Sequence, residues 1–256
     1  MTATPAKMRL DRLLVERGVT PTRERAQALI LAGKVLVNEQ KIDKAGAAVD
    51  PACALRLLGE DLRYVSRGGL KLEKALAHWS IDLTGKTCLD VGASTGGFSD
   101  CMLQHGAVRV IAVDTGYGQM DLRIRSDARV CLLEKTNARY LTAGQIGEAV
   151  DFFAMDVSFI SATLVLPPVL EAVRIDPEHF LRAVVLVKPQ FEVGRDRVGK
   201  GGIVRSEADQ QSALVKVETL LRELGAGRID SIESPILGAE GNREFLLYGE
   251  FKPAPR

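Results

Sequence analysis

A turn of glycines and small residues follows an apolar run at LDVGASTGGFSD, residues 89–100. Three chemistries use such a turn. The spacing from Gly92 to Gly96, with Ser94 at its centre, fits the G-x-S-x-G elbow that presents a nucleophilic serine. A dinucleotide can rest its phosphates on a turn of this kind. A nucleoside ligand with a positively charged tail can bind there as well.

The positions of the histidines disfavour the serine nucleophile. A hydrolase triad of this type needs an acid and then a histidine downstream of the serine, on a late loop. Only His105 and His179 follow Ser94. The first falls in the helix predicted after the turn and the second precedes the fourth predicted strand, so neither lies where the triad requires it.

The glycine spacing weakens the dinucleotide alternative, because Ser94 breaks the G-x-G-x-x-G fingerprint. Asp90, at the end of the preceding strand, would repel a pyrophosphate but attract an ammonium or sulfonium group. Asp114 ends the next apolar run, where a carboxylate can bind the ribose hydroxyls of either kind of cofactor. These charges favour S-adenosylmethionine (SAM). The predicted SAM contacts are Asp90, Gly92, Ala93, Ser94, Gly97, Phe98, Asp114, Asn137 and Asp156.

Apolar runs of strand length alternate with helical stretches from Leu83 onward. This alternation predicts a parallel sheet covered by helices on both faces, an α/β doubly wound fold. Ligands of such sheets bind at the carboxyl ends of the strands. Asp114, Asn137, Asp156 and Lys188 each follow an apolar run, as does the turn at 90–97. The sequence therefore predicts one site at that edge of the sheet.

The residues after two later strands indicate which atom accepts a methyl group. DVSF, residues 156–159, replaces the [N/D]-P-P-[Y/F] turn of amino-group methyltransferases. Asp156 is therefore expected to lack the proline turn and aromatic ring that clamp a base or amide. Lys188 ends the next run in LVKPQFE, and an ammonium there can stabilise negative charge on an alcohol oxygen. The alternative for Lys188 is a surface lysine before a proline turn.

The first 47 residues are basic, with nine Lys or Arg against five Asp or Glu, although the whole chain has a net charge of only +1. Leu10, Leu13 and Leu14 predict one short helix, and a second is expected between its N-cap Thr22 and Gly33. A strand then turns at 38–39 and resumes. Such a basic unit indicates either a polyanionic partner or a solvated charged surface.

Two segments of this region, RLDRLLVERG (9–18) and TRERAQALILAGKVLVN (22–38), resemble the S4 RNA-binding domain. The resemblance implies that basic side chains on the paired helices contact RNA phosphates. Glu39 departs from the family pattern, in which a glycine follows the asparagine, so a looser turn is expected. The residues expected to bind RNA are Arg9, Arg12, Arg23, Arg25, Lys34 and Lys41.

Residues 66–248 resemble the FtsJ-like ribose 2'-O-methyltransferases, whose active site is a Lys-Asp-Lys-Glu tetrad. Lys71 in SRGGLKL, Asp156 in MDVSF, Lys188 in VKPQF and Glu244 in NREF match its members in order. The resemblance implies that Lys188 orients a ribose hydroxyl and that Asp156 and Glu244 hold the two lysines. Lys188 is also expected to stabilise alkoxide character on that oxygen and could serve as the base that accepts its proton. The alternative is that all four residues only position the reactants, with no discrete base.

Taken together, the two resemblances make the chain similar to the TlyA-type ribosomal RNA methyltransferases. They imply an S4 domain at 1–61, an interdomain linker at 62–67 and, over 62–256, a Rossmann-like SAM-dependent methyltransferase domain that methylates a cytidine ribose of ribosomal RNA. Because the sequence stops soon after its last predicted strand, the chain resembles the shorter variety of the family. That resemblance implies the large subunit as the substrate, with the small one as the alternative. Arg67, Arg195 and Arg197 are expected to contact the RNA near the site.

Other protein classes find less support in the composition. No apolar stretch approaches the ~18 residues of a membrane span, and the start carries no apolar signal region, so a cytoplasmic protein is expected. The four cysteines show no C-x-x-C spacing, and we expect buried thiols and no metal. A catalytically weak RNA- or SAM-binding module and a membrane-active haemolysin, a name given to relatives, remain as alternatives. The oligomeric state is not predicted.

Overall fold

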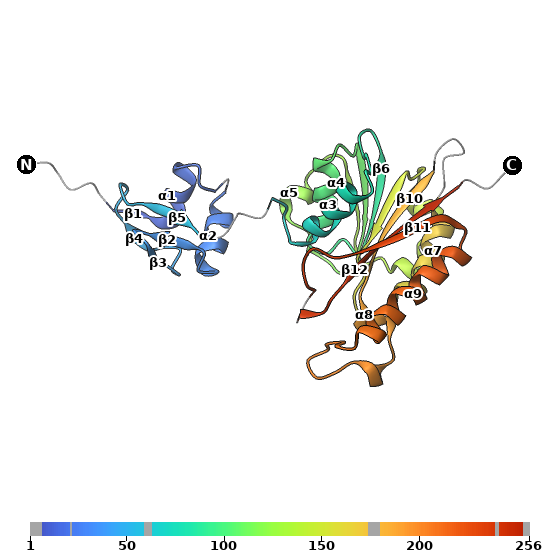
Figure 1. Ribbon diagram of the computed structural model, residues 1–256. Coiled ribbons are helices and arrows are strands. Elements are labelled where there is room, and N and C mark those ends of the chain that lie inside the picture. Colours follow the sequence, from blue (N-terminus) through green and yellow to red (C-terminus); the bar gives the residue numbers. More distant parts are fainter. Residues whose placement is uncertain (1–6, 21, 59–62, 174–179, 239–240, 253–256) are drawn as a thin grey trace, which may run out of the picture. The chain divides into compact units, whose positions relative to one another are not determined.

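The computed structural model describes residues 7–20, 22–58, 63–173, 180–238 and 241–252. Contacts divide the chain into two compact units, residues 1–62 and 63–256 (Figure 1). Each unit is described by itself. None of the helices within the described ranges is long and apolar enough to cross a bilayer.

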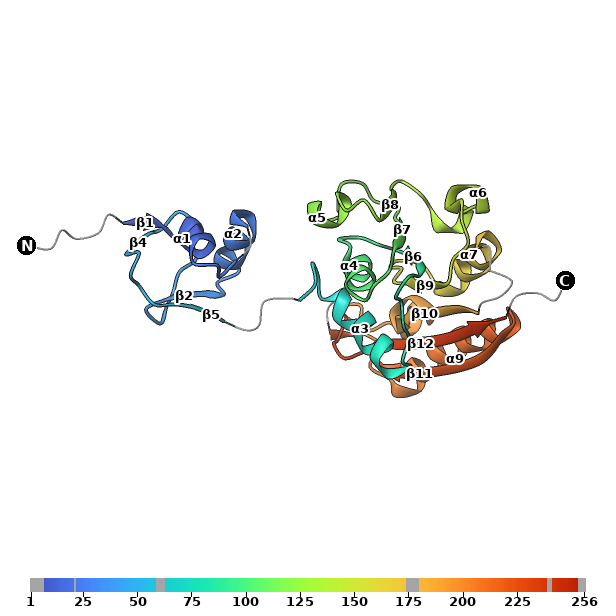
Figure 2. The same cartoon turned by 90° about the horizontal axis from the view of Figure 1, so that it is seen from above.

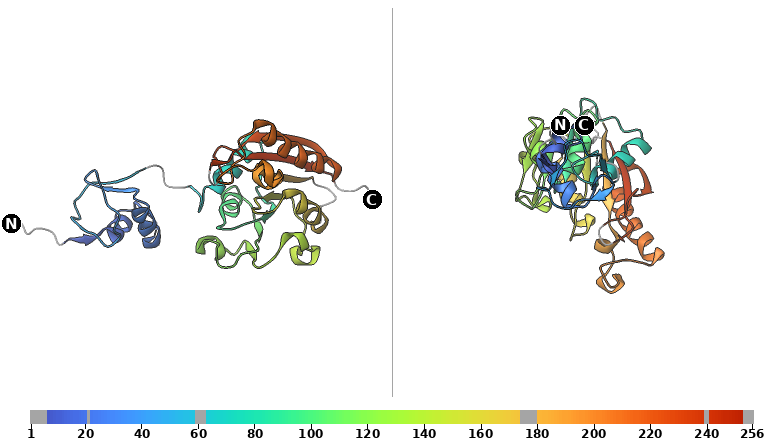
Figure 3. Two further views of the ribbon diagram at one scale, coloured as in Figure 1. Left: turned by 90° about the horizontal axis from the view of Figure 1, so that it is seen from below. Right: turned by 90° about the vertical axis from the view of Figure 1, so that its left-hand side faces the viewer.

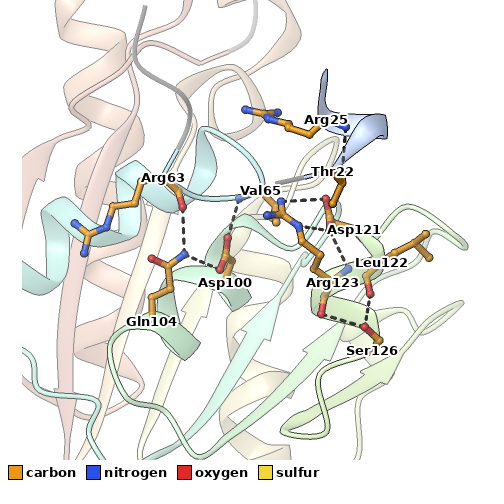
Figure 4. Close-up of polar contacts among 10 residues, drawn as sticks. All are labelled: Thr22, Arg25, Arg63, Val65, Asp100, Gln104, Asp121, Leu122, Arg123 and Ser126. Carbon is orange, nitrogen blue, oxygen red and sulfur yellow. Dashed lines mark hydrogen bonds and ion pairs between the residues drawn. The ribbon is translucent and has the colours of Figure 1, made fainter. Parts of the chain in front are cut away.

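The small unit packs two helices and its short strands around one apolar core. Leu10, Leu14 and Ile30 are fully buried in that core, together with Val35. Thr22 caps the second helix as predicted, since its Oγ1 accepts a hydrogen bond from the Arg25 backbone N–H at 3.2 Å (Figure 4). The elements are β1 (Met8–Arg9), α1 (Leu10–Glu16), α2 (Arg23–Leu31), β2 (Val35–Val37), β3 (Gln40–Lys41), β4 (Ala48–Val49) and β5 (Leu55–Leu57).

The hairpin between β2 and β3 is tighter than expected. Asn38 and Glu39 both take left-handed conformations, with φ of 49° and 64°, in the two-residue turn whose twist suits adjoining antiparallel strands. The Glu39 side chain forms an ion pair with Arg56, and Asn38 Oδ1 accepts from the Ala54 N–H at 2.8 Å. These contacts hold the turn closed without glycine, so the expectation of a looser turn was wrong.

The large unit is built on one seven-stranded sheet of order β11-β12-β10-β9-β6-β7-β8. Neighbouring strands from β10 to β8 run parallel, as predicted. β12 departs from the prediction, because it runs antiparallel to both β10 and β11. The strands are β6 (Thr87–Val91), β7 (Arg109–Val113), β8 (Val130–Leu133), β9 (Phe152–Met155), β10 (Leu181–Val187), β11 (Ala226–Glu233) and β12 (Phe245–Phe251).

Helices cover both faces of this sheet (Figures 2 and 3). Leu72 of α3 and Met102 of α4 belong to the buried cluster on one face. Val217 and Leu221 of α9 belong to the cluster on the other. Each such side chain stabilises the fold by roughly 1.5–3 kcal/mol. The helices are α3 (Gly68–His78), α4 (Gly97–Gln104), α5 (Leu122–Arg125), α6 (Ala143–Ile146), α7 (Leu166–Ala172), α8 (Pro189–Glu192) and α9 (Glu207–Glu223), with short 3-10 turns η1 (Ala138–Tyr140), η2 (Ala162–Leu164) and η3 (Arg195–Arg197).

Residues 63–67, which fall within the predicted linker, pack onto the large unit. Tyr64 is buried, and the Val65 N–H donates to Asp100 Oδ2 at 2.8 Å. Gln104 Nε2 donates to both Asp100 Oδ1 and the Arg63 carbonyl, at 2.8 and 3.2 Å (Figure 4). This segment is therefore anchored on α4. Residue 62, the first of the predicted linker, lies outside the described residues.

Candidate active site

The direction of β12 explains how an acid from the start of a strand joins residues from the ends of others. Asp156 follows β9 and Lys188 follows β10, at the carboxyl edge of the parallel strands. Phe245, the first residue of β12, pairs with Val187, the last residue of β10. Glu244 therefore enters the sheet at the edge where Lys188 leaves it.

A cavity of about 630 Å³ at this edge is lined by all four residues of the predicted tetrad. They form two ion pairs. Lys71 Nζ lies 2.5 Å from Glu244 Oε2, and Lys188 Nζ lies 2.6 Å from Asp156 Oδ1. Two cations thus face one cavity, and each is held by its own carboxylate.

The Lys71–Glu244 pair is deeply buried, with side chains 11% and 2% exposed. Lys71 stands in the first turns of α3, and Glu244 is backed by Gly238, where a β-carbon would come within 2.1 Å of Glu244 Oε1. Burying two charges costs solvation that their attraction often fails to recover. Stability is therefore a weak reason for this pair, and its place on the cavity wall indicates a role in chemistry.

The Lys188 ammonium has a second partner that the sequence did not indicate. Its Nζ donates to Ser158 Oγ at 2.6 Å, in addition to its pairing with Asp156. Ser158 lies two residues beyond Asp156, in the loop after β9. Both partners of Lys188 therefore come from one short segment.

A second cavity of about 430 Å³ shares a wall with the first. Asp114 in that cavity accepts backbone hydrogen bonds from Ser94 at 2.7 Å and from Gly116 at 2.6 Å. Asn137 Oδ1 accepts from the Arg139 N–H at 3.0 Å. The residues lining both cavities are Gly92, Ser94, Asp156, Ser158 and Phe159.

At two glycines of the turn at 92–97, the backbone lies too close to neighbouring residues to leave room for a side chain. A β-carbon on Gly92, where φ is +89°, would lie 2.4 Å from the Asp156 carbonyl oxygen. One on Gly97 would lie 2.1 Å from Ser66 Oγ. Gly96, with φ of 90°, precedes the first turn of α4. The glycines thus allow the backbone of this turn to pack closely enough to line both cavities. Ala93, Gly97 and Phe98, all predicted SAM contacts, line the larger one.

Asp90 lies elsewhere than expected. Its side chain is fully buried toward α4, where Oδ2 accepts from Ser99 Oγ at 2.6 Å, and it lines neither cavity. Burial raises the pKa of its carboxyl to about 7. The negative charge of Asp156 adds to this rise, whereas the hydrogen bond from Ser99 lowers the pKa. Asp90 thus faces α4 from within the strand, and its contact with a ligand's positive charge stays a prediction.

Phe159 is the functional candidate that the sequence interpretation missed. It is 93% exposed, lines both cavities and has a left-handed backbone with φ of 64°. Its ring centroid lies 5.5 Å from that of Phe191. The expectation that this turn lacks an aromatic ring was wrong. The fourth residue of DVSF was the available signal.

The basic residues predicted to bind RNA differ in their freedom. Arg9 of β1 and Arg23 of α2 both bind the buried Asp11 carboxylate of α1 at 2.9 Å, so Arg23 also holds α2 to α1. Arg12 lies 3.9 Å from Glu16, Arg197 pairs with Asp209 at 3.1 Å, and Arg67, Arg195 and Lys41 are exposed. Arg25 and Lys34 are half-buried.

The strand order and the two lysine–carboxylate pairs at the carboxyl edge define a Rossmann-like methyltransferase. The FtsJ-like methyltransferase family matches residues 64–251, and the S4 domain matches residues 8–52. The chain belongs to the FtsJ-like methyltransferases and carries an S4 domain.

Two relatives and one solved structure match nearly the whole chain. YqxC of Bacillus subtilis is 46% identical over 96% of this chain and 86% of its own length. A Mycobacterium tuberculosis protein, 42% identical over 94% of this chain and 89% of its own, is named 16S/23S rRNA (cytidine-2'-O)-methyltransferase TlyA. A solved Streptococcus thermophilus structure, named as a hemolysin, has a TM-score of 0.72 at 41% identity and covers 99% of this chain and 91% of its own.

Proposed function

We propose that this protein transfers the methyl group of SAM to the 2'-oxygen of a cytidine ribose in ribosomal RNA. The observation that carries the proposal is the convergence of two lysine–carboxylate pairs in one cavity. The TlyA relative at 42% identity supports the acceptor, because cytidine-2'-O methylation is its named activity.

SAM fits the two adjoining cavities. Asp114 and Asn137 would bind the nucleoside, since each Asp114 oxygen keeps a lone pair beyond its backbone hydrogen bond. The turn at 92–98 would bind the amino-acid end, because its glycines leave the backbone open to a ligand. When bound, SAM supplies a methyl group on a positively charged sulfur. Asp156 on the shared wall would face that charge.

Lys188 carries the acceptor side of the mechanism. A ribose hydroxyl is a weak nucleophile. Negative charge develops on its oxygen as the hydroxyl gives up its proton to solvent, and the oxygen then takes up the methyl group. The Lys188 ammonium, fixed by Asp156 and Ser158, stabilises that charge. Lys71, fixed by Glu244, adds a second positive charge on the same wall. Fixing the reactants in line supplies several further kcal/mol, on the order of 7 in favourable cases.

Phe159 is placed to contact the base of the acceptor nucleotide. Its ring stands exposed where the two cavities meet. Stacking of a base on an aromatic ring contributes about 1–3 kcal/mol in single-stranded RNA complexes. A cytidine turned out of its helix would present both its ribose and its base to this wall.

The RNA contacts extend beyond the cavity. We assign residues 1–61 to RNA binding through Arg9, Arg12, Arg23, Arg25, Lys34 and Lys41, and residues 62–256 to methyl transfer. Arg67 lines the cavity, and Arg195 and Arg197 stand exposed in η3, close along the chain to Lys188. We propose a ribosomal subunit, the large one, as the substrate and the cytoplasm as the site of action.

The proposal is tested by incubating the protein and radiolabelled SAM with unmodified large and small ribosomal subunits separately. We expect label in large-subunit RNA, at one alkali-resistant dinucleotide. Lys188→Ala is expected to abolish transfer and to leave RNA binding intact. Lys86→Ala is the matched control, because Lys86 also pairs with a carboxylate, Asp151, at 3.1 Å.

Two results would contradict the proposal. Unchanged transfer by Lys188→Ala would remove Lys188 from the mechanism. Unlabelled RNA from both subunits, with SAM and RNA still bound, would favour a binding module without catalysis. Label confined to the small subunit would correct the substrate and keep the reaction.

A further inference from the structure

Two active-site segments run side by side and touch at successive points. The loop at 156–162 follows β9, and the turn at 188–192 follows β10. Asp156 and Ser158 contact Lys188 at the first point. At the second, the ring of Phe159 lies against that of Phe191.

Glu192 makes the third contact, and its carboxylate is the most buried group in the series, with 2% of its side chain exposed. Oε1 accepts from the Ala162 backbone N–H at 2.6 Å, and Oε2 accepts from Ser161 Oγ at 2.5 Å. Lys216 of α9 closes the group, since its Nζ lies 3.1 Å from Oε2 and 3.0 Å from the Glu192 carbonyl oxygen.

The loop held by this carboxylate contains a strained residue. Phe159 has φ of 64°, a conformation that costs a side-chain-bearing residue roughly 1–3 kcal/mol and persists only where the surroundings enforce it. The loop is fixed at its start, where the Asp156 N–H donates to the Val91 carbonyl at 2.8 Å. Glu192 fixes its other end, two residues beyond Phe159.

We propose that Glu192 is a positioning residue for methyl transfer. Its carboxylate fixes the loop at 156–162 to the turn at 188–192, and so sets where Ser158 and Asp156 hold Lys188 and where Phe159 stands. The inference rests on the proposed function. Glu192 lines neither cavity and acts only through the loop.

Glu192→Gln is the main test, because the amide keeps the volume and one acceptor but turns a donor group toward Ser161 and Lys216. A displacement of about 1 Å at the reacting groups can cost ~100-fold in rate. We expect the kcat of rRNA methylation to fall about 10- to 100-fold while KM for RNA changes less than about threefold, since most RNA contacts lie elsewhere. Ser161→Ala, which removes one of the two loop contacts, is expected to lower kcat by a smaller factor.

Asp151→Asn is the matched control. Asp151 also accepts from a backbone N–H, that of Thr87 at 2.9 Å, and from a lysine, Lys86, at 3.1 Å, but it does so at the start of β9. We expect this variant to lose comparable thermal stability and to keep its kcat. Equal kcat in Glu192→Gln and Asp151→Asn would overturn the proposal.

Hydrogen exchange supplies a readout independent of activity. Amides of residues 158–164 are expected to exchange about tenfold faster in Glu192→Gln than in the wild type, and unchanged in Asp151→Asn. Unlabelled RNA with the wild-type protein would mark failure of the proposed function. Wild-type activity together with unaltered kcat and exchange in Glu192→Gln would mark failure of the positioning role alone.

Discussion

Individual charges in this protein serve different ends according to their burial. Surface pairs such as Arg12–Glu16, 3.9 Å apart with both side chains more than half exposed, contribute about 0–1 kcal/mol. Lys71 and Glu244 are almost completely enclosed, and removal of either side chain would leave the other without its partner inside the protein. This pair therefore serves methyl transfer while contributing little to the stability of the fold.

Substitution of the pair separates these two effects. Glu244→Gln leaves Lys71 buried opposite a neutral group and is expected to lower the free energy of unfolding by roughly 3 kcal/mol and to abolish transfer. The double variant Lys71→Met/Glu244→Leu is expected to recover most of the stability and none of the activity. Urea unfolding and methyl transfer measure the two quantities. Equal activity in the wild type and the double variant would contradict a catalytic role for the pair.

Asp90 gives a pH dependence with a definite sign. Burial raises its pKa from an ordinary 3.8 to about 7, so the folded state binds this proton more tightly than the unfolded chain does. Its contribution to stability is complete below about pH 4 and is lost as the pH rises to about 7. Relative to Asp90→Asn, which does not titrate, the wild type should lose up to ~4 kcal/mol across that window. Denaturant unfolding of both proteins at pH 4 to 8 checks this, and a pH-independent difference would contradict it.

At the scale of elements, the site is assembled by strand ends and the turns that follow them. Five neighbouring parallel strands point their ends at one edge, and the antiparallel β12 brings its start to the same edge. The Glu244 carboxylate is then held in place by close packing against the backbone of Gly238. A larger residue at position 238 would occupy the space that this carboxylate fills.

Gly238→Ala tests that fit. The added methyl would come within 2.1 Å of Glu244 Oε1 and must displace the carboxylate from Lys71. We expect transfer to fall at least about tenfold, with a smaller effect on stability. Gly227→Ala in β11 is the control, since nothing lies within 4 Å of the β-carbon that it adds. Equal activity of the two variants would show that the close approach has no consequence for the site.

The sequence predicted most elements because their signals are local. Thr22 at a helix start and the glycines around Ser94 mark boundaries that the structure contains. The direction of β12 was not predictable in this way, because strand pairing is set by distant residues. The burial of Asp90 toward α4 was not predictable either, since a strand residue faces one side only and sequence does not say which. The Glu192 contacts depend on three separate segments and left no local pattern.

At the scale of the whole molecule, charge is divided between two units. The first 47 residues carry an excess of four positive charges, while the complete chain carries one. An RNA-binding unit of this kind governs affinity through phosphate contacts, and a separate catalytic unit governs the rate once RNA is bound.

Replacing Lys34 and Lys41 by glutamine is expected to weaken RNA binding and leave kcat at saturating RNA unchanged. Removal of one phosphate-binding lysine lowers the slope of log K against log salt by about 0.7–0.9. The double variant should therefore bind with a slope smaller by about 1.5, measured by filter binding at several salt concentrations. An unaltered slope, or a fall in kcat instead, would show that these lysines do not bind RNA phosphates.

Lys71 and Glu244 stand 173 positions apart in the chain, although their side chains meet. A ribosome makes the lysine early and the acid late, and β12 can enter between β10 and β11 only after both strands exist. Long-range pairings of this kind form slowly. A nascent chain can thus hold a folded RNA-binding unit and most of its sheet while its site is still incomplete. Catalytic competence therefore waits for β12, so the chain cannot methylate RNA while its own β12 is still being made.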